Sequence, residues 1–267
     1  MAKSTDSSIT VIGAGIVGIC CACYLQRSGF RVTLIDREEP AMQTSFGNAG
    51  GISPGSVAPI GMPGMWQQIP GWLIDDQSPL FIKARHFPKA LPWLMRFIHQ
   101  SRRSRVLEIS KALTALNGPT FKAYQPLLED AGITNLFHQT GQLFVYHTRQ
   151  SMEKDTFTRE LRSAAGTRVE HLDSKAIQDI EPALAPVFEA GYLMPDNGHC
   201  KNPLGLAQAL AQMFVNKGGQ LLKTEVRDFV FEAGGISGLL MTSGQLPAKK
   251  VVIATGIWSR ELCLKLG

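Results

Sequence analysis

Three glycines and one aspartate near the start of the chain have the types and spacing to bind a dinucleotide. Gly13, Gly15 and Gly18 form a G-x-G-x-x-G pattern, and Asp36 follows 18 residues after the last of them. Gly13 permits a tight turn, Gly15 lets the backbone approach a pyrophosphate, and Gly18 allows a helix to pack closely on a strand. The Asp36 carboxylate would accept hydrogen bonds from the hydroxyl groups of an adenosine ribose.

The elements that must position these residues follow in the required order. Residues 9–12 are an apolar, β-branched run typical of a buried parallel strand, and residues 31–35 predict a second strand that ends at Asp36. Residues 16–28 predict a helix between them, which Gly29 would end. This order predicts a Rossmann-like unit, with a purely structural glycine-rich turn as the alternative. The pattern does not distinguish NAD from FAD.

A second stretch, TSFGNAGGIS at residues 44–53, contains mostly small residues. Its glycines, hydroxyl groups and amide suit a flat, polar ring that lies against the backbone, and an ordinary surface loop is the alternative. A domain specific for NAD would usually continue with another strand and helix at this point. The stretch therefore favours FAD.

Several segments together carry a resemblance to a known family. VIGAGIVG, LIDRE, TSFGNAGGISPG and GMPG, in this order, resemble the D-amino acid dehydrogenases, which belong to an FAD-dependent family that also contains D-amino acid, glycine and sarcosine oxidases. The resemblance continues through residues 179–186, 191–203 and 251–259, and so covers essentially the whole chain. It implies an α/β fold, a Rossmann-like FAD-binding domain with an inserted α+β substrate domain. The FAD-binding domain is expected in two segments, residues 1–82 and residues 191–267, and the second segment also contains part of the substrate sheet. The substrate domain is expected at residues 83–190.

The resemblance also implies which residues contact the cofactor. The first strand, the glycine turn and the start of the helix supply Val11, Ile12, Gly13, Ala14, Gly15, Ile16, Val17 and Gly18, followed by Asp36 and Arg37. The small-residue loop, which lies along the flavin in the family, supplies Thr44, Ser45, Asn48, Ala49, Gly50 and Gly51. The later segments supply Val226, at a position whose backbone touches the adenine in the family, and the turn Ala254, Thr255 and Gly256. No metal site is expected, because the six histidines are scattered and no cysteine pair has a second pair nearby.

The reaction implied by the resemblance is oxidation of a D-amino acid to a 2-oxo acid and ammonia, with electrons passed to a respiratory-chain acceptor. The family binds the substrate carboxylate with Arg and Tyr side chains, mostly from its C-terminal third, and this chain ends at Gly267, soon after the Ala-Thr-Gly turn. We therefore assign no catalytic residue, although Arg85, Arg96 and Tyr146 are the first candidates for a carboxylate clamp within residues 56–200. An oligomer, or a partner chain that supplies the C-terminal part, is expected. Two alternatives stay open: a non-catalytic or partner-dependent fragment of such an enzyme, and an NAD-dependent dehydrogenase.

The composition is that of a globular chain, with 267 residues, 44% of them hydrophobic and 18% charged. Its five cysteines, three of them crowded at Cys20, Cys21 and Cys23, do not predict a disulfide framework, and small core residues in a reducing compartment are favoured. A cytoplasmic location is expected, with peripheral attachment to the inner face of the plasma membrane as an addition to it. Residues 7–26 contain no charge and would be long enough to span a bilayer, but the glycine spacing favours the nucleotide-binding interpretation.

The formal net charge of +5 comes from one stretch of the chain. Residues 77–107 contain no Asp or Glu but seven basic residues, which are Lys83, Arg85, Lys89, Arg96, Arg102, Arg103 and Arg105. A general nucleic-acid-binding protein would distribute its charge more widely. The stretch also contains Phe87, Trp93, Phe97 and Ile98. It therefore predicts either a helix on a membrane surface or, as the favoured interpretation, a solvated helix whose apolar side belongs to the core.

Overall fold

The apolar runs predicted as strands align in parallel in the sheet that carries the glycine turn. The computed structural model describes residues 7–67, 83–232 and 234–267. Strand β1 (Ser8–Ile12) pairs with β2 (Arg31–Asp36) on one side and with β13 (Val251–Ile253) on the other, and β2 pairs with β9 (Gln220–Lys223). The strand order is β13-β1-β2-β9, with Ile12 beside both Ile35 and Ile253. The expected Rossmann-like α/β fold is confirmed.

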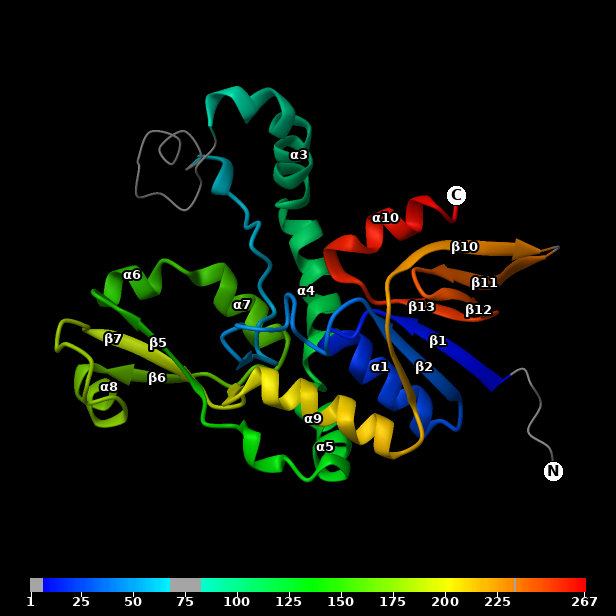
Figure 1. Cartoon of the computed structure of the whole chain (residues 1–267). Helices are drawn as coiled ribbons and strands as arrows, with labels where there is room; N and C mark the ends of the chain where they lie inside the picture. The colour runs from blue at the N-terminus through cyan, green and yellow to red at the C-terminus, as the bar shows by residue number, and fades with distance from the viewer. Residues whose placement is uncertain (1–6, 68–82, 233) are drawn as a thin grey trace. The chain divides into compact units, whose positions relative to one another are not determined.

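Two helices from distant parts of the chain pack together beside this sheet. Helix α1 (Ile16–Arg27) follows the glycine turn and contacts α9 (Pro203–Asn216) (Figure 1). The predicted end of the first helix at Gly29 is confirmed, and so is the start of α9, which Asn202 followed by Pro203 predicts. Gly29, with a φ of 89°, follows α1, and the Asn202 side chain accepts a hydrogen bond of 2.9 Å from the amide of Gly205 at the start of α9.

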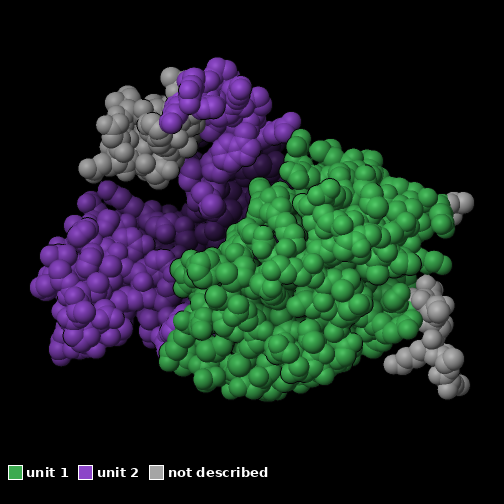
Figure 2. Space-filling model, viewed as in Figure 1, with its two compact units in different colours: residues 1–50, 123–138, 200–267 green, residues 51–122, 139–199 purple. Residues whose placement is uncertain are grey.

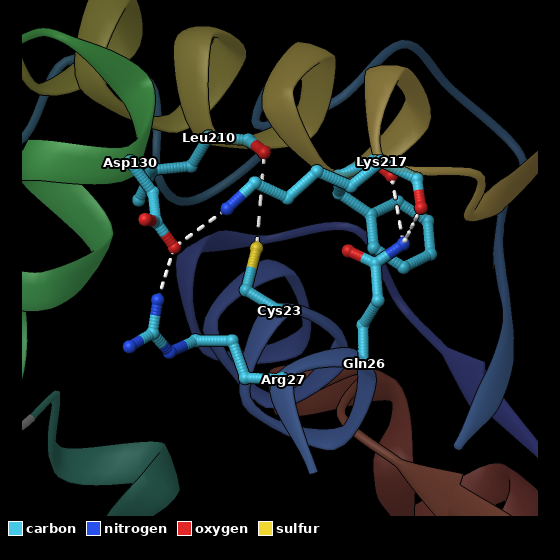
Figure 3. Close-up of polar contacts among 7 residues, drawn as sticks. Cys23, Gln26, Arg27, Asp130, Leu210 and Lys217 are labelled. Carbon is cyan, nitrogen blue, oxygen red and sulfur yellow. Dashed lines mark hydrogen bonds and ion pairs between the residues drawn. The ribbon is translucent and has the colours of Figure 1, made fainter. Parts of the chain in front are cut away.

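A third helix, α5 (Thr120–Ala131), is joined to these two by ion pairs. Asp130 binds Arg27 of α1 and lies 2.7 Å from the ammonium group of Lys217, the residue after α9 (Figure 3). The hydrogen bond from Lys217, and then that from Arg27, lowers the pKa of Asp130. The side-chain amide of Gln26 donates two hydrogen bonds of 3.1 Å to carbonyl groups at the end of α9 (Figure 3). These polar contacts tie three segments that are far apart in the sequence.

The other face of the parallel sheet meets a small antiparallel sheet. Strands β10 (Val226–Glu232), β11 (Gly235–Met241) and β12 (Gly244–Pro247) pair in this order, and a short helix, α10 (Ser259–Leu264), follows the turn after β13. Side chains alternate along a strand, so Ile12 and Ile35 project from one face of the parallel sheet. They share an apolar cluster with Phe229, Leu239, Ala248 and Leu262.

The remaining residues form a second antiparallel sheet and most of the other helices. Strands β5 (Gln142–Tyr146), β7 (Ala190–Met194) and β6 (Glu170–Asp173) pair in the order β5-β7-β6. The helices of this part are α3 (Phe87–Gln100), α4 (Arg103–Asn117), α6 (Arg149–Glu153), α7 (Thr156–Ala164) and α8 (Ser174–Ile180). The shorter elements of the described residues are β3 (Gly51–Ile52), η2 (Met65–Gln67), η3 (Ala84–His86), η4 (Thr134–Leu136), β4 (Phe137–His138), β8 (Gly198–Cys200) and η5 (Gly256–Trp258).

The chain divides into two compact units, each made of separate segments (Figure 2). Unit 1 contains residues 1–50, 123–138 and 200–267, and unit 2 contains residues 51–122 and 139–199. These limits differ from the expected boundaries after residues 82 and 190. In particular, residues 123–138 belong to unit 1, because they contain most of α5, and Asp130 of α5 binds α1 and the residue after α9. The boundary after residue 82 falls outside the described residues. Compactness assigns no task to either unit, so the substrate domain stays a prediction.

Several elements differ from those predicted. Pro88 and Pro92 predict interruptions before a helix, but α3 continues across both. The helix is exposed, so water can bind the carbonyl group that the missing N–H of Pro92 leaves free. The polar residues 151–165 predict a single helix, but the structure has α6 and α7 there, separated at residues 154 and 155. Strands β6, β8 and β12 and helix α10 were not predicted.

Residues 7–26 do not form one continuous apolar helix. They contain β1, the glycine turn and most of α1. Within the described ranges, no helix combines the length and apolar character needed to cross a membrane.

Candidate dinucleotide-binding site

The glycine turn between β1 and α1 has no room for side chains at two positions. Gly13 has a φ of 104°, and a Cβ atom there would lie 2.5 Å from the carbonyl oxygen of Ala254. A Cβ atom on Gly18 would overlap the carbonyl oxygen of Gly13. These two glycines therefore bring the start of α1 against the ends of β1 and β13. Gly15 is different, because a Cβ atom there would meet only the hydroxyl oxygen of Ser45, at 3.3 Å.

Asp36 at the end of β2 is held in a fixed orientation toward this turn. Its Oδ2 accepts a hydrogen bond of 2.6 Å from the amide of Ala14, and its Oδ1 accepts one of 3.0 Å from the amide of Glu38. Its carbonyl oxygen accepts a third, of 2.7 Å, from the amide of Thr224. Each carboxylate oxygen can accept a further hydrogen bond, so the group can still receive ribose hydroxyls.

The small-residue loop reaches the start of α1 through one hydroxyl group. Ser45 Oγ accepts a hydrogen bond of 3.0 Å from the amide of Ile16 in the first turn of α1. The side chain of Asn48 donates to the carbonyl of Ser45 at 2.7 Å and accepts from the amide of Gly50 at 2.8 Å. The Ile16 amide therefore meets a polar oxygen, at a helix end that favours negative charge. Thr44 and Ala49 are exposed beside this turn.

The turn after β13 lies against the glycine turn. The Ala254 amide donates a hydrogen bond of 2.7 Å to the carbonyl of Ile12. Thr255 is within 3.1 Å of the hydroxyl of Ser259, and Gly256 has a φ of 57°. Trp258 also lies here, a residue that was not predicted, although an aromatic residue two positions after Gly256 could have indicated it. Its ring centroid lies 4.8 Å from the guanidinium carbon of Arg37, a cation–π distance.

The structure brings together most, but not all, of the predicted residues. The glycine turn, Asp36, Ser45 and the turn at residues 254–256 are joined by the contacts described above. Val226 instead pairs with Met241 and packs at the edge of the apolar cluster between the two sheets of unit 1. Gly51 belongs to unit 2, where it pairs with His199. The cofactor role of each residue stays a prediction.

The candidate clamp residues also belong to unit 2, and no contact joins the three to one another. Arg85 and Arg96 are exposed on or next to α3. Tyr146 is half-buried on β5, with its ring centroid 5.9 Å from that of Tyr192. Among the described residues, no group of three or more His, Cys, Asp or Glu residues could hold a metal ion.

The geometry of unit 1 fits a dinucleotide such as FAD. Gly15 leaves the first turn of α1 accessible to a pyrophosphate, where the Ile16 amide already binds an oxygen atom. Asp36 is oriented by two amides and keeps capacity for ribose hydroxyls. The residues present can therefore hold the adenosine and pyrophosphate parts of the cofactor.

Comparisons with known proteins point the same way. Residues 8–267 match the DAO family, described as FAD dependent oxidoreductase. The chain is 31% identical to a D-amino-acid oxidase of Bradyrhizobium diazoefficiens, over 97% of this chain and 62% of that protein. It is also 31% identical to a D-amino acid dehydrogenase of Vibrio vulnificus, over 96% of this chain and 63% of that protein. The chain thus spans less than two thirds of the length of these curated relatives.

Solved structures with the same fold include a glycine oxidase from Bacillus cereus, with a TM-score of 0.65 and 20% identity over 97% of this chain and 57% of that one. An L-proline dehydrogenase from P. horikoshii matches with a TM-score of 0.66 and 22% identity, over 98% of this chain and 56% of that one. At these identities the likeness concerns the fold alone.

Proposed function

We propose that unit 1 binds FAD and that the protein oxidises D-amino acids. The premise is that this chain belongs to the DAO family of FAD-dependent oxidoreductases. The observation that carries the FAD proposal is the pair of hydrogen bonds by which Asp36 and Ser45 hold the amides of Ala14 and Ile16. Asp36 ends the second strand, and Ser45 belongs to the small-residue loop. Both therefore converge on the turn that would receive the pyrophosphate.

The protein side of the reaction is binding and orientation. Asp36 would accept the ribose hydroxyls, and amides at the start of α1 other than that of Ile16, which donates to Ser45, would donate to the pyrophosphate. The loop from Thr44 would lie along the flavin. The substrate loses a hydride from Cα and a proton from its amino group, and water then converts the imino acid to a 2-oxo acid and ammonia. Bound FAD supplies the acceptor for the hydride. No residue of this chain is assigned a catalytic role.

The names of the relatives support a D-amino acid as the substrate but leave two electron acceptors. One relative is named an oxidase and others are named dehydrogenases. We place this chain with the dehydrogenases, because the TSFGNAGGISPG segment resembles that branch. Electrons would then pass to a respiratory-chain acceptor at a membrane, from an enzyme in the cytoplasm or attached to the inner face of the plasma membrane.

A second candidate function is a fragment that depends on further chain or on a partner. The observation that favours it is the coverage of 62–63% of the curated relatives. By the resemblance, most of the carboxylate clamp of the family comes from its C-terminal third. Such a fragment would bind FAD but would not turn over D-amino acids by itself.

The absorption spectrum of purified protein after incubation with FAD and gel filtration tests the cofactor. We expect a bound flavin in the wild type and none in Gly15→Leu, whose side chain would occupy the space in front of the α1 amides. The thermal melting of both apoproteins is measured as a control for folding. Tight NAD binding without flavin binding would contradict the proposal.

Turnover of D-alanine separates the two candidate functions. Reduction of an artificial dye without hydrogen peroxide is the expected dehydrogenase result. Production of hydrogen peroxide would identify an oxidase. A flavin-loaded protein with neither activity would favour the dependent fragment.

A further inference from the structure

Helix α3 exposes more apolar surface than its expected place in the core allows. Of its 14 residues, only Leu94 is buried. Leu91 is 43% exposed and Met95 is 60% exposed, and Phe87 is exposed one turn before them. Residues four apart lie on the same side of a helix, so these three form one apolar stripe. The favoured interpretation of a helix with its apolar side in the core is therefore wrong for this stripe.

Aromatic side chains are exposed on another side of the same helix. Trp93 is 61% exposed, and its ring stacks on Phe97 with 5.2 Å between the centroids. Phe97 lines a small, mainly apolar hollow together with Met65 and Trp66, and Trp66 is 59% exposed. Two exposed indole rings thus lie near the ring of Phe97. Tryptophan is enriched where an apolar layer meets water, because its ring has both an apolar body and a polar N–H.

The solvent-facing part of the helix between these apolar groups carries positive charge. A helical turn of 100° per residue places Lys89 and Arg96 on the same side, between Met95 and Trp93. Neither Lys89 nor Arg96 has an ion-pair partner within the described part of the chain, and the same holds for Lys83, Arg85 and Arg102. Where both partners lie in the described ranges, the ion pairs of the basic stretch are those of Arg103 with Glu160 and of Arg105 with Glu108. The charge of this surface is therefore available for an anionic partner.

We propose that the α3 surface, defined as Phe87, Lys89, Leu91, Trp93, Met95, Arg96 and Trp66, docks on an anionic lipid bilayer. Charge complementarity selects the partner, since each basic residue close to an anionic leaflet favours attachment. Exposed apolar side chains beside these charges would enter the headgroup region, as in other interfacial helices. A helix of 14 residues is about 21 Å long, which is shorter than the roughly 30 Å hydrocarbon core, so α3 lies on the bilayer and does not cross it.

Flotation with lipid vesicles tests this surface in the 267-residue chain. We expect attachment to vesicles that contain phosphatidylglycerol and none to pure phosphatidylcholine. Raising the salt to about 1 M, where the Debye length is about 3 Å, should weaken attachment at least tenfold. On the same anionic vesicles the tryptophan emission of the protein should shift to the blue, and Trp93→Phe together with Trp66→Phe should remove most of that shift.

Matched charge variants show whether the α3 surface or the net charge is responsible. Lys89→Glu with Arg96→Glu should weaken attachment at least tenfold. Lys249→Glu with Arg260→Glu removes the same charge from exposed residues of unit 1 and should leave attachment unchanged. An equal loss of vesicle attachment in both double variants would overturn the proposal. So would attachment of the wild type to neutral vesicles as strong as that to anionic vesicles. Self-association that α3 variants abolish, without any vesicle binding, would identify a second copy of the chain as the partner and would also overturn it.

The result is independent of the proposed reaction. Flavin binding and D-alanine turnover are measured beside vesicle attachment in the wild-type chain. Vesicle attachment without flavin or turnover would support the α3 surface and contradict the proposed function. Flavin binding and turnover without vesicle attachment would support the proposed function and contradict the α3 surface.

Discussion

At the scale of single residues, Asp36 performs two tasks that the sequence pattern does not separate. It was singled out as an acceptor for ribose hydroxyls, but its carboxylate also orders the turn through the amides of Ala14 and Glu38. Asp36→Ala should therefore weaken FAD binding by about 1–3 kcal/mol, since the ribose hydroxyls would lose their hydrogen-bond acceptor. Titration of apoprotein with FAD measures the change. Asp179→Ala, which removes an exposed aspartate of α8, is the control and should leave the dissociation constant unchanged.

A comparison with Asp36→Asn separates the two tasks. An asparagine keeps one oxygen for the Ala14 amide but loses the negative charge. We expect the melting temperature of this apoprotein to stay closer to wild type than that of the alanine variant, while FAD affinity still falls. An unchanged dissociation constant in both variants would contradict the ribose role.

The cysteines were expected to be small core residues, and this holds for Cys23 and Cys200 but is wrong for Cys263, which is exposed. Burial raises the pKa of Cys20 to about 11 and that of Cys23 to about 12. The thiolate is the reactive form, so these two groups should react slowly with iodoacetamide near the ordinary thiol pKa of about 8.5. Peptide mass mapping should find Cys263 labelled first and Cys23 only after unfolding. Equal labelling of both cysteines in the native protein would show that the α1 region opens readily.

At the scale of elements, the sequence predicted best what depends on neighbouring residues. Gly29 after α1 and Asn202 with Pro203 before α9 act within a few positions, so the helix ends could be placed. Strand β12 could not be predicted, because GQLP is short and contains Gly and Pro, and it is a strand only because β11 pairs with it. The contact of Ser45 with Ile16 spans 29 positions and depends on the folded loop. The candidate site was therefore predictable as a set of residues but not as a set of hydrogen bonds.

The ion pairs of Asp130 link three helices and should contribute a pH-dependent part of the stability. The folded pKa of Asp130 is lowered, so this contribution is present above the ordinary Asp pKa of about 3.9 and is lost as the pH falls through the lower folded value. Asp130 and its partners are partly exposed, which limits the contribution to about 0.2–1 kcal/mol.

Thermal melting of Asp130→Asn tests this link. We expect a lower melting temperature than wild type near neutral pH, and convergence of the two curves at the acid end. Glu129→Gln removes one charge from the same helix at a residue without an ion pair among the described residues, and should melt like wild type. A difference between Asp130→Asn and wild type that persists in acid would point to packing and not to the ion pairs.

At the scale of the whole molecule, both units end their sheets on strands that can accept more chain. Within the described residues, β13 is one of the two outer strands of the parallel sheet, and β5 is an outer strand of the sheet in unit 2. The antiparallel sheet of unit 1 also exposes apolar side chains, since Phe231 is 52% exposed and Leu240 is 46% exposed. Open edges and exposed apolar side chains favour pairing with another segment or another chain.

We therefore expect the 267-residue chain to associate, or to need further chain or a partner, and to oxidise D-amino acids weakly. Light scattering after gel filtration gives the mass in solution, and dye reduction with several D-amino acids gives the turnover. Phe231→Ser with Leu240→Ser should reduce association if the antiparallel sheet of unit 1 is the contact, while Val187→Ser, an equally exposed apolar residue of unit 2, should not. A monodisperse monomer with full turnover would contradict this prediction. The carboxylate clamp would then have to come from residues 56–200, and Tyr146 would be the first to replace, because it is half-buried beside Tyr192 whereas Arg85 and Arg96 are exposed.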